Sequence, residues 1–247
     1  MPALRREVRE VLLVLGVSLG ASAAYSVVSL LAKLTANRPL AQQTATLNPS
    51  QAPGRPWLDL TYQLMGIFFA LVPALLALHL LGSSAAQRLG LDRERPRFDA
   101  LAGVLLAAAI GIPGLGLYLL AHALGVNATV VPAALPHVWW AVPVLVLSAA
   151  QNALLEEIVV VGYLLTRLRE LGWQAWAAVA ASATLRGAYH LYQGFGAFVG
   201  NAVMGVVFGL FFLRTRRILP LVVAHSLLDI VSFVGYALLR DRLPFLR

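Results

Sequence analysis

The chain has little charge and no cysteine. Of its 247 residues, 12% are Asp, Glu, Lys or Arg, compared with about 25% in an ordinary soluble domain. The absence of cysteine excludes disulfide bonds, thiolate metal sites and a cysteine nucleophile. We also expect no Gly-x-Ser-x-Gly elbow, the turn that carries the nucleophile in many serine hydrolases. In contrast, 60% of the residues are hydrophobic, and the mean hydropathy is +0.78. Because the apolar residues form long runs, we predict an integral membrane protein.

A net charge of +8 could indicate a nucleic-acid partner. However, the basic residues lie mostly in short loops between apolar runs, as membrane orientation requires. We therefore expect membrane lipid around the protein and no nucleic acid. We expect no cofactor, and the sequence does not indicate an oligomeric state.

Seven apolar segments predict an all-α polytopic bundle of seven spans, or eight if one segment divides, forming a single membrane domain over residues 1–247. The segments are residues 8–34, 58–81, 99–124, 138–168, 173–192, 198–213 and 218–239. Residues 21–23 resemble a signal cleavage site, but the apolar run continues beyond them, so we predict an uncleaved anchor. We expect the polar loop 35–56 to be mobile and not catalytic.

The basic residues indicate an orientation in the cell membrane. If the N-terminus is cytoplasmic, most of them fall on the cytoplasmic side, as the positive-inside rule expects. These are Arg5, Arg6, Arg9, Arg88, Arg93, Arg95, Arg97, Arg167, Arg169, Arg214, Arg216 and Arg217. The C-terminal tail, with Arg240, Arg242 and Arg247, fits this orientation badly.

Away from the tails, loops and span ends, four charged residues remain inside the predicted spans: Glu156, Glu157, Arg186 and Asp229. A charge at the bilayer centre costs about 2.5–3.5 kcal/mol on insertion scales. These four residues come from three different spans. We therefore expect them to face one another or an aqueous cavity.

Polar residues spaced by four extend this group, because such spacing places both members of a pair on one helix face. The pairs are His225 with Asp229, Arg186 with His190, and Asn152 with Glu156. Glu156 and Glu157 are adjacent and should point about 100° apart on an α-helix. We expect different roles for them, one as a base and the other as the partner of an arginine.

The order of these motifs, Glu156-Glu157, then His190, then His225 with Asp229 four residues later, resembles the CPBP family. These are the CAAX-protease and bacteriocin-processing intramembrane endopeptidases, also called the Abi family. Their pattern is EExxxR, FxxxH and HxxxN or HxxxD, and the resemblance covers residues 136–239 as a catalytic core.

The resemblance implies a glutamic-type, metal-independent peptidase acting on a membrane-associated peptide or protein. By position, Glu156 is the general base that activates water, and His190 and His225 position that water and the scissile carbonyl. Asp229 takes the place of the Asn or Asp that supports the oxyanion. Glu157 is the partner of the motif arginine.

Two residues depart from the pattern, since Val161 occupies the arginine position and Arg186 the phenylalanine position. An exchange explains both: Arg186 reaches Glu157 from the neighbouring helix. The opposing interpretation is a degraded site with an unrelated arginine.

Other functions remain open at this level. The polar cluster could be a structural ion pair in an inactive scaffold or immunity protein. It could also form the path of a small-solute or proton transporter, because intramembrane carboxylates mark such paths. Two His, a Glu and an Asp could bind zinc, but an HExxH helix is missing and an arginine would oppose the cation.

Overall fold

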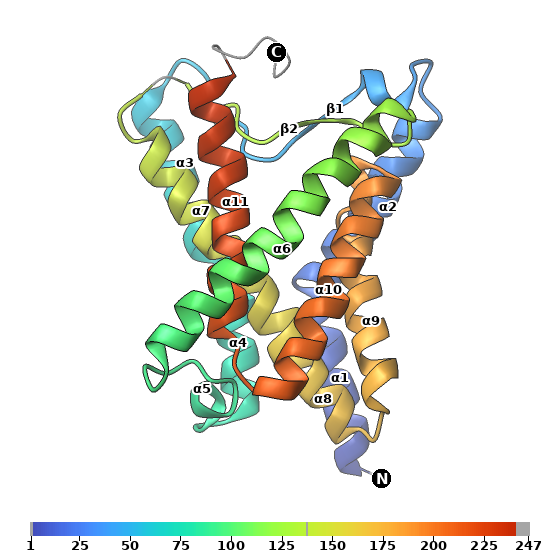
Figure 1. Ribbon diagram of the computed structural model, residues 1–247, viewed down its shortest axis with the longest axis vertical. Coiled ribbons are helices and arrows are strands. Elements are labelled where there is room, and N and C mark those ends of the chain that lie inside the picture. Colours follow the sequence, from blue (N-terminus) through green and yellow to red (C-terminus); the bar gives the residue numbers. More distant parts are fainter. Residues whose placement is uncertain (1, 137, 241–247) are drawn as a thin grey trace.

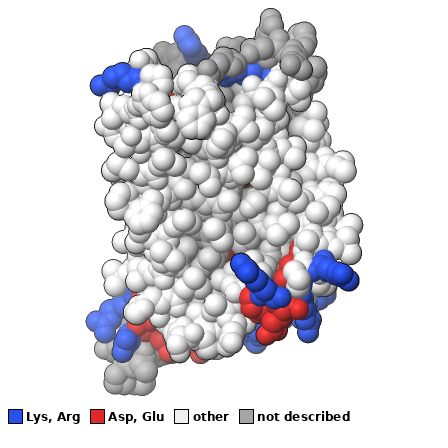
Figure 2. All heavy atoms as spheres, turned by 90° about the vertical axis from the view of Figure 1, so that its left-hand side faces the viewer, with Lys and Arg blue, Asp and Glu red and all other residues white. Residues whose placement is uncertain are grey.

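The surface of the molecule is divided into two charged ends and an uncharged belt. On the face in Figure 2, Lys, Arg, Asp and Glu gather at the ends and are almost absent between them. Large apolar side chains are exposed on the helices of this belt, among them Phe68 (66%), Ile112 (77%) and Val231 (73%). Such a belt fits the hydrocarbon core of a bilayer, and the protein is a multi-pass membrane protein.

The computed structural model describes residues 2–136 and 138–240, and it is almost entirely helical (Figure 1). The helices are α1 (Pro2–Gly16), α2 (Leu19–Leu34), α3 (Pro56–Ala70), α4 (Val72–Leu81), α5 (Ala85–Arg88), α6 (Pro96–Ala123), α7 (Ala141–Glu156), α8 (Leu164–Glu170), α9 (Ala175–Ala188), α10 (Phe195–Thr215) and α11 (Leu219–Leu239). Shorter elements are the 3-10 helices η1 (Leu40–Gln42) and η3 (Leu191–Gln193), the π-helix η2 (Glu157–Tyr163), and the strands β1 (Thr44–Thr46) and β2 (Thr129–Val131).

The all-α membrane bundle is confirmed, but the count of seven or eight spans is not. Within the described residues, five helical stretches are long and apolar enough to cross a membrane: Pro56–Leu81, Pro96–Ala123, Ala141–Glu170, Phe195–Thr215 and Leu219–Leu239. The α1–α2 pair, bent by 51°, makes a sixth if it counts as one span. Helix α9 has 14 residues and would reach about 21 Å, less than the roughly 30 Å of a hydrocarbon core.

The central helix of the bundle is the stretch from α7 through η2 to α8. Within an apolar stretch of 18 residues in this helix, 67% of the residues are buried. In the corresponding stretch of α6, only 6% are buried. The predicted segment 138–168 therefore exists as one 30-residue stretch, with a π-helix in its middle. The wide π turn is supported from outside, because the Ser182 hydroxyl of α9 donates to the Val160 carbonyl at 2.8 Å.

The polar loop 35–56 contains short regular elements. It contains η1 and β1, and β1 pairs in parallel with β2, with Thr44 opposite Thr129. Asp59, at the start of α3, accepts hydrogen bonds from the Ser50 hydroxyl at 2.6 Å and the Gln51 amide at 2.9 Å. Hydrogen bonds therefore connect the two long loops at this end of the molecule. The basic residues Arg242 and Arg247 of the orientation count lie outside the described residues.

Glycine lets neighbouring helices approach closely at two places that position the polar centre. On α10, a Cβ added at Gly205 would lie 2.8 Å from the Ala183 Cα of α9. On α6, a Cβ at Gly103 would lie 2.5 Å from Val223 of α11. Small residues of this kind allow the close packing on which membrane helix association depends.

We predict that Gly205→Val destabilises the protein by about 1–3 kcal/mol, because the new side chain meets backbone that cannot move aside. Gly116→Val on α6 is the matched control, since nothing lies within 4 Å of a Cβ at that position. Thermal unfolding of both variants in detergent measures the difference. Equal unfolding temperatures for the two variants would contradict the packing argument.

Candidate active site

Arg186 is the centre of the polar cluster and is completely buried, with 0% exposure. Its Nη2 donates to Glu157 Oε1 at 2.7 Å, and its Nη1 donates to Glu156 Oε2 at 3.4 Å. The guanidinium lies 5.5 Å from the centre of the Phe208 ring on α10. A single arginine from α9 therefore compensates two carboxylates on the central helix.

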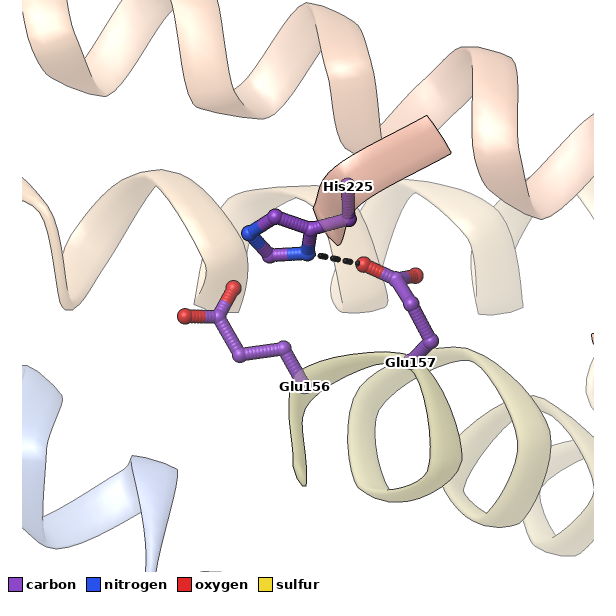
Figure 3. Close-up of side chains that lie close together, drawn as sticks. All are labelled: Glu156, Glu157 and His225. Atoms are coloured by element: carbon purple, nitrogen blue, oxygen red, sulfur yellow. Dashed lines mark hydrogen bonds and ion pairs between the residues drawn. The ribbon is translucent and has the colours of Figure 1, made fainter. Parts of the chain in front are cut away.

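Glu157 faces two cationic or hydrogen-bonding groups and no open space. Its Oε1 accepts from Arg186 and also from His225 Nδ1 at 2.7 Å (Figure 3). The side chain is 0% exposed, and its Oε2 has no hydrogen-bond partner among the described residues. This glutamate is therefore fully enclosed by the protein and bound through Oε1.

Glu156 lies across the His225 ring from Glu157 (Figure 3) and is surrounded differently. Its Oε2 accepts a hydrogen bond from the Tyr189 hydroxyl at 2.7 Å. Its side chain retains 12% exposure, whereas the Glu157 side chain has none. The two adjacent glutamates therefore share Arg186 but differ in their second partner, which is Tyr189 for Glu156 and His225 for Glu157.

Tyr189 is a site residue that the sequence analysis missed. It is buried at 5% exposure, and its ring packs against the His190 ring with centroids 4.7 Å apart. A sequence signal did exist, since a buried tyrosine hydroxyl requires a hydrogen-bond partner and Tyr189 stands directly before the motif histidine.

His190 follows α9 directly and is fixed by its own helix. Its Nδ1 lies 2.9 Å from the Arg186 carbonyl oxygen, which can only accept, so Nδ1 carries the proton. In the neutral ring, Nε2 is then the acceptor. The residue is partly exposed, and the Tyr189 hydroxyl, not the His190 ring, donates the hydrogen bond to Glu156.

Asp229 and Asn152 join the cluster from α11 and α7. Asn152 Nδ2 donates to Asp229 Oδ2 at 3.2 Å, and the same oxygen is 3.8 Å from His225 Nε2. The Asp229 side chain is 20% exposed. The structure thus brings every predicted site residue into one linked group from α7, η2, α9 and α11.

The chain folds locally so that these helices meet. The π-helix begins at Glu157, and π turns inside α-helices often occur at functional sites. Gly205 lets α10 approach α9 at the level of Arg186, since a Cβ there would lie 3.3 Å from Arg186 Cδ. This approach brings the Phe208 ring close to the guanidinium.

The donor set for a metal ion is incomplete. Glu156, Glu157 and His225 can offer ligand atoms within 4.8 Å of one another. However, Arg186 donates to both carboxylates, and a cation at their oxygens would have to displace it. The residues as arranged fit a charge-paired site better than a metal site.

Contrary to expectation, the sequence does contain the letters of a serine-peptidase elbow, from Gly16 to Gly20. This pattern lies at the break between α1 and α2, not at the strand-to-helix turn that such an elbow requires. The Ser18 hydroxyl donates to the Val14 carbonyl of its own helix. The geometry therefore gives no support to a serine nucleophile here.

A comparison with known protein families finds a match over the segment that carries the polar cluster. Residues 138–231 match the family model "Type II CAAX prenyl endopeptidase Rce1-like". This segment is similar to the CAAX-protease family. The matched segment is less than half of the chain, but it includes every candidate catalytic residue of the cluster. No curated protein and no solved structure matches the chain significantly.

The similarity of this segment to a protease family supports peptidase activity in a membrane. It does not assign roles to individual residues. The exchanged positions Val161 and Arg186 are of special interest, because the structure places Arg186 against Glu157 and buries Val161 completely in the apolar core.

We predict that Arg186→Met destabilises the protein by about 3–5 kcal/mol, because it leaves two buried carboxylates without their cation. Adding Glu157→Gln to that variant should recover part of the loss, since one unpaired charge is then removed. Arg214→Gln, at an exposed arginine of α10, is the control for a lost positive charge. Thermal unfolding in detergent gives the comparison, and an Arg186→Met protein as stable as the control would contradict the charge pairing.

Proposed function

We propose that this protein is an intramembrane endopeptidase in which Glu156 activates water to hydrolyse a peptide bond of a membrane-associated protein or peptide. One observation carries the proposal: Glu157 is enclosed by Arg186 and His225 with no exposure, whereas the Glu156 side chain beside them keeps 12% exposure and is bound through Oε2. A general base needs an oxygen within reach of its water, and these observations support Glu156 over Glu157 in that role.

The proposed reaction uses only groups of this chain and water. Glu156 takes a proton from water as the oxygen attacks the scissile carbonyl, which gives a tetrahedral intermediate. The same proton then passes from Glu156 to the leaving amine as the C–N bond breaks. The products are a new carboxyl terminus and a new amino terminus, and Glu156 returns to its ionised form.

The neighbours of Glu156 have supporting roles in this proposal. Tyr189 and Arg186 donate to Glu156 Oε2 and thereby direct Oε1 at the water. His190 and His225 orient the water and the carbonyl, and a donor nitrogen can stabilise the developing oxyanion. Asn152 fixes Asp229 on the oxyanion side of the site.

Arg186 replaces the motif arginine in this account. The usual position, Val161, is buried and apolar, and Arg186 supplies the ion pair to Glu157 from α9 instead. The net charge of the site is the same in both arrangements. The departure from the family pattern is then a relocation of one charge and not a loss of the site.

The proposal extends to the setting of the enzyme. We propose a single membrane domain over residues 1–247, with residues 136–239 as the catalytic core, in the cell membrane with a cytoplasmic N-terminus. The arginine-rich ends of α8, α10 and the α5–α6 loop lie with the N-terminus at one end of the molecule (Figure 1), in agreement with the positive-inside rule.

We predict that Glu156→Gln abolishes cleavage, a loss of at least about 10²-fold for a missing general base, while the protein stays folded. Membrane peptides from cells carrying the parent or the variant can be compared by mass spectrometry. Glu170→Gln, at the end of the same span, is the matched control and should leave the peptide profile unchanged.

Other functions give other outcomes in this comparison. A scaffold or immunity protein keeps its phenotype when Glu156 becomes glutamine, and a transporter loses solute flux with no change in peptides. Either result would refute the proposed protease function.

We predict that purified enzyme in lipid vesicles keeps its activity after treatment with a metal chelator. In the proposed mechanism Glu156 activates the water as a base, and Arg186 occupies the carboxylate oxygens that a cation would bind. The measurement is the cleavage rate before and after chelation, with zinc added back to the treated sample. Loss of activity that zinc restores would instead favour a metal-dependent mechanism.

A further inference from the structure

A second buried charge cluster lies outside the candidate site, at the end of the molecule where α11 begins. Arg217 stands two residues before α11 and is 6% exposed. Its Nε and Nη2 donate to the two oxygens of Asp99 at 2.7 Å each. Its Nη1 and Nη2 also reach Asp92 at 3.4 and 2.8 Å. We name Arg217, Asp99 and Asp92 the α11 clamp.

The clamp joins two separate parts of the chain. Asp92 lies in the loop between α5 and α6, and Asp99 lies in the first turn of α6, so both acids come from outside the segment 138–231 that matches the family. Arg217 comes from within that segment, in the turn between α10 and α11. The fork of a guanidinium on a carboxylate fixes direction as well as distance.

Backbone contacts add to the clamp at the same place. The Ile218 amide donates to the Leu89 carbonyl at 2.7 Å. Gly90, at φ 62°, approaches so closely that a Cβ there would lie 2.8 Å from the Arg216 carbonyl oxygen. The loop after α5 is therefore docked directly onto the turn that starts α11.

The electrostatics of this end agree with a tight ion pair. The hydrogen bonds from Arg217 hold the pKa of Asp92 below its usual value. Asp99 and Arg217 are both buried, so bulk water screens their attraction less than it would on an open surface.

Helix α6 continues the contact with α11 toward the site. Asp99, Gly103 and Gly111 lie at intervals of four and eight residues, on one helix face. Added Cβ atoms would lie 2.5 Å from Val223 at Gly103 and 2.7 Å from Leu228 at Gly111. These close contacts flank His225 in sequence, so α6 supports the segment of α11 that carries His225 and Asp229.

We propose that Arg217 is a positioning residue for catalysis: the α11 clamp fixes α11 along its axis so that His225 meets Glu157 and Asp229 meets Asn152. This inference rests on the proposed function. Arg217 and His225 are eight residues apart, about 12 Å along a helix, so Arg217 touches no reacting group. A shift of α11 by one residue rise, about 1.5 Å, would break the 2.7 Å bond between His225 and Glu157.

The test compares Arg217→Gln with Arg88→Gln in the full chain in lipid vesicles. Arg88 lies at the same end and forms a 2.7 Å ion pair with Glu170, so its variant loses the same charge without touching α11. The probe is a quenched fluorescent peptide built from a cleavage site found in the Glu156→Gln comparison. Asp92→Asn, which removes the less buried acid of the clamp, serves if Arg217→Gln fails to fold.

The second readout is the position of α11 itself. Because the chain has no cysteine of its own, spin labels attach only to the two cysteines that are introduced. Gln174→Cys, exposed between α8 and α9, and Val231→Cys, 73% exposed on α11, give a separation that reports axial movement of α11.

We expect Arg217→Gln to lower kcat at least about tenfold with KM within about threefold, because misplacement of a catalytic group affects the chemical step more than binding. The label separation should shift or broaden in this variant, and Arg88→Gln should match the parent in both measurements. Unchanged kcat in Arg217→Gln, or a lowered kcat with an unchanged label separation, would overturn the proposal. If the parent itself cleaves nothing, the proposed function fails, and the label separation alone decides whether the clamp holds α11.

Discussion

The pairing of Arg186 with two adjacent glutamates is the interaction on which the rest of the site depends. A guanidinium with 0% exposure is unfavourable inside a membrane protein unless carboxylates compensate it, and two carboxylates without a cation are equally unfavourable. The three groups therefore require one another, and they bind α9 to the central helix. Glu157 is held by Arg186 and His225 with no exposure, and the proposal therefore assigns the chemistry to Glu156, whose side chain keeps 12% exposure.

The surrounding fold brings this pairing about through backbone geometry. A π turn begins at Glu157, Ser182 of α9 donates to the carbonyl of Val160 in that turn, and Gly205 lets α10 approach the buried arginine. Helix α11 then adds His225 and Asp229 from the opposite side, supported along α6. Helix α6 belongs to the N-terminal half, which lies outside the family match. The N-terminal half therefore supports α11, one of the helices that carry the site.

Much of the site could be predicted from the sequence because buried charges are rare in an apolar chain. Counting them isolates Glu156, Glu157, Arg186 and Asp229, and spacing by four adds His190, His225 and Asn152. The structure links all of these residues. Their catalytic roles follow from resemblance and remain part of the proposal.

Features that depend on tertiary contacts were not predictable in this way. Hydropathy marks residues 173–192 as a span, but it cannot show that α9 ends at Ala188 or that the first span bends by 51°. The π-helix has no signature in a run of valines. Tyr189 and Arg217 resembled an ordinary aromatic residue and an ordinary loop cation, because their partners lie far away in the sequence. The letters of a serine-peptidase elbow do occur from Gly16 to Gly20, contrary to our expectation. However, they lie at a break between two helices, and the letters alone do not make an elbow.

The central claim is that Glu156 activates water and does not itself attack the scissile carbonyl to form a glutamyl anhydride. A single turnover of the purified protein in water enriched with ¹⁸O, in lipid vesicles and with enzyme in excess of a substrate peptide, tests it most directly. Mass spectrometry of the product should find one ¹⁸O atom in the new carboxyl terminus, and none of this product with Glu156→Gln. A product formed in the first turnover without ¹⁸O would show that its oxygen came from the enzyme and would contradict the account.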